Sequence, residues 1–263
     1  MNILDKIVAD KHKEVQLKKQ LIPAALLENY PLFERNTSSL ASALKNSNSG
    51  IIAEHKRRSP SKDVINQSLN VQDVTTGYEN AGACGMSVLT DAKYFGGSLD
   101  DLILARAAAN MPLLRKEFII DPYQILEAKA HGADVILLIA AILSQEELKE
   151  FSTLAKSLQL DVLLEVHDLA ELEKSLLPNV DMLGVNNRNL KTFEVSTDVS
   201  KELSEKIPAD FVKVSESGIS SVEVIKDLQD YGYRGFLIGE NFMKTSNPGA
   251  HAKKFIEDLN SSK

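Results

Sequence analysis

Residues 51–63 read IIAEHKRRSPSKD, and this stretch decides the fold because its apolar strand ends in charged side chains. Residues i and i+2 of a strand face the same side, so Glu54 and Lys56 leave the strand together. Charges on that face are costly to bury unless they are paired or used. Ionisable or amide side chains likewise end four later apolar runs, at 113–117, 162–166, 183–187 and 212–216. Five such strand ends indicate the active-site edge of a parallel-sheet enzyme.

Strand-like and helix-like segments alternate after residue 50. The predicted strands lie near 51–56, 86–90, 113–117, 134–139, 161–166, 181–186, 211–215 and 235–239. The predicted helices lie near 71–81, 98–109, 121–131, 144–158, 168–176, 198–206, 220–230 and 249–260. Strands that are each followed by a helix predict a single α/β domain, a (β/α)8 TIM barrel over residues 50–263. The main rival, an open doubly wound sheet, usually carries a G-x-G-x-x-G turn, which this sequence lacks.

Residues 1–49 do not fit the repeat and are predicted to form an N-terminal helical extension of the same domain. Helical patterns cover about 2–20 and 23–29, and a short helix lies near 39–45. Two placements stay open, a cap on the bottom or side of the barrel and a segment that covers the substrate at the top. Start signals of later helices include Ser144 and a Ser220/Glu223 capping box.

Composition limits the classes of function. The chain has 263 residues, of which 43% are hydrophobic and 25% charged, as in an ordinary globular protein. The net charge of −7 argues against a nucleic-acid or anionic-membrane surface, although the basic run 56–58 could still hold a phosphate. Cys84 is the single cysteine, which excludes an intrachain disulfide. Neither a signal core nor an apolar run of about 18 residues is present, so we expect a cytoplasmic protein.

Three charged residues, Glu54, Lys116 and Glu165, lie at predicted carboxyl ends of barrel strands. Each of them alone could be a structural ion-pair residue. Barrel enzymes place their catalytic groups at this face, so the shared location favours a catalytic role. The amino ends of the strands carry aspartates that we interpret as solvated strand starts: Asp134, Asp161 and Asp181.

The loops after the last two strands predict a phosphate site. They read SESGI at 215–219 and IGE at 238–240. Small residues let backbone N–H groups approach an anion, and these loops are the usual phosphate cradle of such barrels. The Glu240 carboxylate is expected to point away from the cradle and to leave only its N–H near the ligand.

Other notable residues have simpler interpretations. His167-Asp168 resembles half of a metal-dependent phosphohydrolase site, but no companion pair is present, so we expect a solvent-facing helix start. Without a Cys/His/carboxylate cluster, no metal site is predicted. Cys84 is expected to pack in the interior. Lysines of a charged helix face are expected to be solvated: Lys11, Lys13, Lys18 and Lys19.

Seven motifs occur in order over about residues 50–245: IAEHKRRSPSK, SVLTDAKYFGGS, PLLRKEFIIDPYQILEAKAHGAD, LLEVHDLAEL, LGVNNRNLKTF, VSESGI and LIGENFM. Together they resemble the indole-3-glycerol phosphate synthase family. The resemblance implies ring closure of 1-(2-carboxyphenylamino)-1-deoxyribulose 5-phosphate with loss of CO2 and water, and no metal or organic cofactor. It implies a phosphorylated small-molecule substrate, and no nucleic acid or membrane as partner. We expect a monomer, with a weak dimer as the alternative.

The resemblance also implies roles for individual residues. Lys116 matches the family's general acid and Glu165 its usual base. Glu54 would orient or share that proton transfer, and Lys56 would supply positive charge near the substrate. The implied substrate-binding residues are Ser59, Phe118, Asn186 and Arg188. The implied phosphate-binding residues are Glu216, Ser217, Gly218, Gly239 and Glu240.

Three positions depart from the family pattern. His55 stands where an apolar residue is usual, Asp63 where glycine is usual, and Glu117 where aspartate is usual. His55 is expected to face the surrounding helices. Rival hypotheses are a related phosphate-binding barrel, such as a phosphoribosylanthranilate isomerase or a tryptophan synthase α-like lyase, and a non-enzymatic barrel that binds a phosphometabolite. The clustered lysines and glutamates argue against all three.

Overall fold

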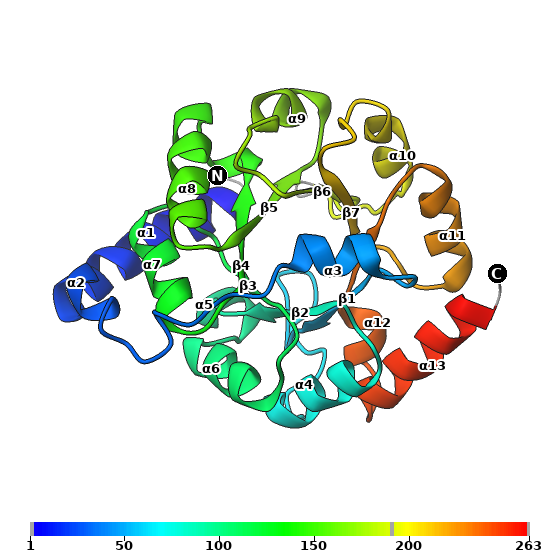
Figure 1. Ribbon diagram of the computed structural model, residues 1–263, viewed down its shortest axis with the longest axis horizontal. Helices are drawn as coiled ribbons and strands as arrows, with labels where there is room; N and C mark the ends of the chain where they lie inside the picture. Colours follow the sequence, from blue (N-terminus) through cyan, green and yellow to red (C-terminus); the bar gives the residue numbers. More distant parts are fainter. Residues whose placement is uncertain (1–2, 190–191, 262–263) are drawn as a thin grey trace.

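Eight parallel strands close into a barrel in the computed structural model, which describes residues 3–189 and 192–261. Each strand pairs with its neighbours in the chain, and the first also pairs with the last (Figure 1). The strands are β1 Ile51–His55, β2 Gly85–Leu89, β3 Leu113–Lys116, β4 Val135–Ile139, β5 Asp161–Val166, β6 Met182–Asn186, β7 Val212–Glu216 and β8 Gly235–Ile238. The predicted (β/α)8 barrel is confirmed.

Helices surround the barrel and follow its strands (Figure 1). The outer helices are α4 Val71–Asn80, α6 Leu99–Ala108, α7 Tyr123–Ala130, α8 Gln145–Ser157, α9 Leu169–Ser175, α10 Asp198–Ser204, α11 Val222–Asp230 and α13 Pro248–Ser261. Short helices after strands are α5 Ala92–Phe95, η1 Ala140–Ile142 and α12 Glu240–Met243. The extension contains α1 Ile3–Leu21, α2 Ala24–Leu27 and α3 Leu40–Asn46. The predicted elements are present, and their bounds differ by at most two residues.

Helix α3 closes the amino end of the barrel, where it lies across the opening (Figure 1). Its Leu40 and Leu44 are fully buried against inward-facing strand residues such as Ile52 and Val214. Gly85 allows this approach, because a Cβ there would lie 2.7 Å from Leu40 Cδ1. Burying two leucines contributes about 1.5–3 kcal/mol each, so α3 is a substantial part of the core.

Helix α1 lies at the carboxyl end of the barrel. The extension therefore occupies both placements that the sequence left open, because α3 caps the amino end and α1 lies at the end where the substrate is expected. Its Ile7, Lys11 and Val15 form a buried stripe at helical spacing. The Lys11 ammonium is 3.0 Å from Asp91 Oδ2 and 3.0 Å from Glu117 Oε1, and only 2% of its side chain is exposed. The expectation of a solvated Lys11 is wrong, because carboxylates after β2 and β3 pair with it.

Two of the three aspartates at the amino ends of the strands are also not solvated. Asp134 is fully buried and accepts hydrogen bonds from Arg35 at 2.6 Å and Arg106 at 2.7 Å. Asp161 is buried and accepts from the Ser39 hydroxyl at 2.8 Å. Asp181 is half-buried beside Lys156. Two of these carboxylates fix the extension to the barrel, which is why they tolerate burial.

Two helix start signals of the sequence have different outcomes. Ser144 forms a capping box with Glu147, as its sequence suggests. The Ser220/Glu223 box is wrong, because α11 is preceded by Ser221 as N-cap. His55 is buried on the helix-facing side of β1, as expected. Cys84 packs among apolar residues of the barrel interior. None of the helices in the described ranges is long and apolar enough to cross a membrane.

Candidate active site

A cavity of about 410 Å³ opens at the carboxyl ends of the strands. Ile3, Leu4 and Ile7 of α1 form part of its wall, so the extension lines it. Its lining includes all the candidate residues of the sequence: Glu54, Lys56, Ser59, Lys116, Phe118, Glu165, Asn186, Arg188, Glu216, Ser217, Gly218, Gly239 and Glu240. The strand alternation explains this convergence, because the polar strand-end residues stand two positions after inward-facing core residues.

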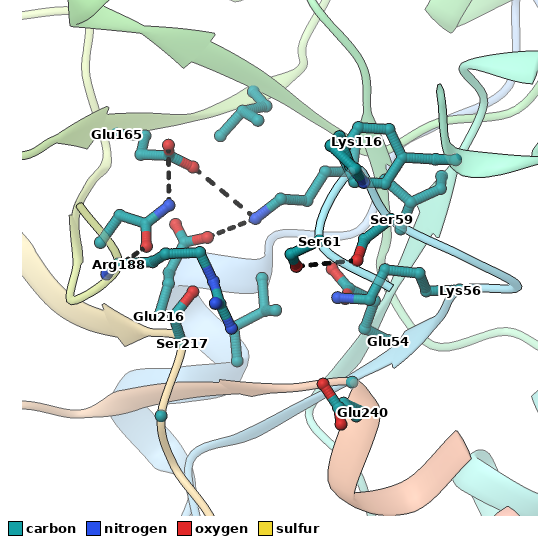
Figure 2. Close-up of a pocket in the computed structure, with 18 of the residues that line it drawn as sticks. Glu54, Lys56, Ser59, Ser61, Lys116, Glu165, Arg188, Glu216, Ser217 and Glu240 are labelled. Carbon is teal, nitrogen blue, oxygen red and sulfur yellow. Dashed lines mark hydrogen bonds and ion pairs between the residues drawn. The ribbon is translucent and has the colours of Figure 1, made fainter. Parts of the chain in front are cut away.

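Lys116 is the centre of the charged cluster. Its ammonium donates to Glu216 Oε2 and lies 3.7 Å from Glu165 Oε2 (Figure 2). Burial alone would lower the pKa of Lys116, but Glu216, Glu165 and Glu54 outweigh it, and the pKa is raised. The group is therefore a full ammonium at neutral pH, which is the state a general acid needs.

Glu54 and Lys56 form the pair that their spacing predicts, with Lys56 Nζ 2.6 Å from Glu54 Oε1. Burial tends to raise the pKa of Glu54, but Lys56 and Lys116 outweigh it, so the pKa is lowered and the carboxylate is ionised. Gly239 makes room for it, since a Cβ at that position would collide with Glu54 Oε1. The next basic residue, Arg57, is held by Asp101 at 2.5 Å and does not enter the cavity wall.

Glu165 is held by an amide from the next strand. Its Oε1 accepts a hydrogen bond from Asn186 Nδ2 at 3.0 Å, and Asn186 Oδ1 accepts from the Arg188 backbone N–H at 3.0 Å. These contacts fix one oxygen of the carboxylate and leave Oε2 toward Lys116. His167 Nε2 lies 3.4 Å from Oε1, so the expectation of a solvent-facing His167 is wrong.

Glu216 was expected among the phosphate-binding residues, but its side chain lies elsewhere in the cavity. Its carboxylate lies in the barrel interior on Lys116. Burial raises the pKa of Glu216 to about 7 against the pull of Lys116, and Glu165 raises it further. Alternation along β7 is the signal for this position, because Val214 and Val212 face the interior two and four residues earlier.

The loops after β7 and β8 form the other end of the cavity. Ser217 and Gly218 have φ values of 68° and 76°, so the chain turns sharply there. A Cβ at Gly218 would collide with Val195, which makes glycine the residue that fits. The Glu240 carboxylate, labelled in Figure 2, pairs with Lys62 of the first loop, with 2.7 Å between Lys62 Nζ and Glu240 Oε1.

An apolar wall faces these loops. The Phe118 and Phe95 rings lie 5.9 Å apart between centroids. Glu117 Oε1 accepts the Phe118 backbone N–H at 2.9 Å and also pairs with Lys11. The α1 helix is thus connected to the strand end that carries the central lysine, a link that the sequence did not reveal.

A family model for indole-3-glycerol phosphate synthase matches residues 4–255. The chain belongs to the indole-3-glycerol phosphate synthase family. An indole-3-glycerol phosphate synthase of Bacteroides thetaiotaomicron is 48% identical over 98% of this chain and 99% of its own length. One of Bordetella pertussis is 40% identical over 97% and 99%. Members of the indole-3-glycerol phosphate synthase family are carboxy-lyases of tryptophan biosynthesis that use a phosphorylated small-molecule substrate.

Solved structures of lower identity share the fold. A 3-hexulose-6-phosphate synthase from Salmonella typhimurium has a TM-score of 0.63 at 14% identity and covers 81% of this chain and 100% of its own. A tryptophan synthase complex from Pyrococcus furiosus has a TM-score of 0.59 at 15% identity, with 81% and 98% covered. Both support the barrel alone, whereas the indole-3-glycerol phosphate synthase relatives support the family.

Proposed function

We propose that the cavity closes the ring of 1-(2-carboxyphenylamino)-1-deoxyribulose 5-phosphate, with Lys116 as general acid. The observation that carries the proposal is the place of the Lys116 ammonium, partly buried among the carboxylates of Glu54, Glu165 and Glu216. As the aromatic carbon attacks the ribulose carbonyl, its oxygen becomes an alkoxide. An alkoxide is a strong enough base to take a proton even from a lysine whose pKa is raised. Such a transfer contributes typically about 10²–10⁴-fold.

Glu165 is the proposed base of the later step. Loss of CO2 leaves its bonding electrons in the ring and restores aromaticity. The hydroxyl then leaves as water, and a base must remove a proton from the adjacent carbon that carries nitrogen. Glu165 lies beside Lys116, and Asn186 fixes its orientation. Glu54 orients or shares this transfer, and Lys56, already paired with it, supplies positive charge to the substrate.

Binding is assigned to the two ends of the cavity. Backbone N–H groups of the turns at 217–218 and 239–240 hold the phosphate, while Phe118 packs against the anthranilate ring and Ser59, Asn186 and Arg188 contact the linking chain. A cavity of about 410 Å³ is in the range for ligands of this size. The Glu216 carboxylate positions the Lys116 ammonium and does not contact the phosphate.

Turnover of the substrate tests the proposal directly. Purified protein is incubated with the carboxyphenylamino-deoxyribulose phosphate, and indole fluorescence is followed. We expect a rise in indole signal with release of CO2. Isomerase or tryptophan synthase α-like activity would leave this substrate unchanged, and a binding protein would quench or shift its fluorescence without releasing CO2.

The extension and barrel are proposed to fold as one domain, a monomer in the cytoplasm, with a weak dimer as the alternative. The ion pairs of Lys11 with Glu117 and of Arg35 with Asp134 support the single domain. A single cooperative urea transition of the whole chain is expected. Sedimentation at several protein concentrations distinguishes the monomer from the dimer.

A further inference from the structure

His167 lies behind Glu165, outside the cavity lining. It follows β5 directly and precedes the N-cap Asp168 of α9. Its Nδ1 is 3.1 Å from Glu171 Oε2, and that oxygen also accepts the His167 backbone N–H at 2.8 Å. Its Nε2 is 3.4 Å from Glu165 Oε1. The imidazole thus stands between the proposed base and a glutamate at the start of α9.

The partners determine the tautomer of a neutral His167. An ionised carboxylate only accepts hydrogen bonds, so Nδ1 carries the hydrogen that bonds Glu171. The lone pair is then on Nε2, which is buried without a hydrogen-bond partner and lies 3.4 Å from Glu165 Oε1. Buried polar atoms are usually satisfied, so an open acceptor beside a proposed base calls for a function.

We infer that His167 is a positioning residue that receives the proton which Glu165 removes from the substrate. This inference rests on the proposed role of Glu165 as base. In the step, the O–H bond of protonated Glu165 breaks and an N–H bond forms at Nε2, which restores the carboxylate and leaves an imidazolium. The hydrogen bond from Nδ1–H to Glu171 is kept throughout. The Nε2 proton passes to water before the next turnover.

The charges around the ring favour this direction of transfer. Burial lowers the pKa of His167, but Glu171, Glu165 and Glu216 outweigh it and raise the pKa. The raised pKa of the ring favours the imidazolium, so the ring is able to hold the proton that it receives. The charged groups that face the ring are Glu165 from β5, Glu171 from α9 and Glu216 from β7, with Lys116 of β3 beyond Glu165.

The test measures kcat and KM against pH for wild type, His167→Asn and Glu171→Gln. In wild type we expect kcat to rise through the titration of His167, since only the neutral ring accepts a proton. His167→Asn should lower kcat by about tenfold or more, with KM within about twofold, and added imidazole should restore turnover. Glu171→Gln keeps an acceptor for both N–H groups, so it should fold normally and move the acidic limb to lower pH.

Wild-type kcat in His167→Asn would overturn the inference, as would a loss that imidazole does not rescue. If His167→Asn does not fold, the kcat profile of Glu171→Gln decides the question. An acidic limb at the wild-type pH in that variant overturns the inference. Glu165→Gln separates this result from the proposed function. Normal turnover in Glu165→Gln refutes Glu165 as base, whereas a dead Glu165→Gln beside an unaffected His167→Asn refutes only the transfer to His167.

Discussion

Replacing Glu216 by glutamine should make the protein more resistant to alkaline pH. Burial raises the pKa of the Glu216 carboxyl to about 7, from the ordinary value of 4.5 that the unfolded chain keeps. The folded state therefore binds this proton more tightly than the unfolded state. The resulting cost to stability is absent below about pH 4.5, grows as the pH rises, and is complete above about pH 7.

The size of the effect follows from the two values. The gap from 4.5 to about 7, at about 1.4 kcal/mol per pH unit, gives about 3 kcal/mol. Between about pH 5 and pH 8, this cost to the free energy of unfolding should grow by about 2–3 kcal/mol, because Glu216 of the unfolded chain is already partly ionised at the lower pH. Glutamine also has a cost of its own beside Lys116, and the part of that cost that does not vary with pH cancels in the comparison.

Urea unfolding at both pH values measures the effect. The free energy of unfolding of Glu216→Gln, relative to wild type, should rise by about 2–3 kcal/mol from about pH 5 to pH 8. Glu150→Gln, which changes an exposed glutamate on α8, is the matched control and should change by less than about 0.5 kcal/mol. An equal difference between Glu216→Gln and wild type at the two pH values would refute the raised pKa.

Four further substitutions have definite outcomes. Lys11→Met should lower the free energy of unfolding by about 3–5 kcal/mol and raise KM, because the buried carboxylates of Asp91 and Glu117 lose the ammonium that they share and α1 is loosened. Unchanged stability in urea unfolding would contradict this. Gly239→Ala should lower kcat by about tenfold or more, since its Cβ displaces the Glu54 carboxylate, and a wild-type kcat would show that this carboxylate has room to move. Glu165→Gln should remove the acidic limb of the kcat profile, whereas Glu54→Gln should lower kcat and keep that limb; the reverse result would exchange the two roles.

The barrel and the charged strand ends could be predicted because they depend on local periodicity. A period of two residues places Glu54, Lys116 and Glu165 on the inward face of the sheet. Eight strands with helices between them indicate a closed (β/α)8 barrel. The resemblance to the family implied the catalytic roles of these three residues. The same alternation also places Glu216 in the interior beside Lys116, although the glycine-containing turn that follows it is typical of a phosphate site.

Burial of charged residues outside the strands could not be predicted in the same way. Lys11 and Asp134 are polar, and each is buried because a partner arrives from a distant segment of the chain. Local sequence does not contain those partners. Helical spacing gave one usable sign, because Lys11 stands four residues from both Ile7 and Val15 on the buried stripe of α1.

The most direct test of the central claim is the turnover number of Lys116→Ala, followed by indole fluorescence. Lys149→Ala, which removes an exposed lysine of α8, is its control. If Lys116 is the general acid, kcat falls by about a hundredfold or more while the circular dichroism spectrum is unchanged and Lys149→Ala keeps wild-type kcat. A folded Lys116→Ala protein that turns over within about threefold of wild type, a difference below 1 kcal/mol in the barrier, would contradict the account.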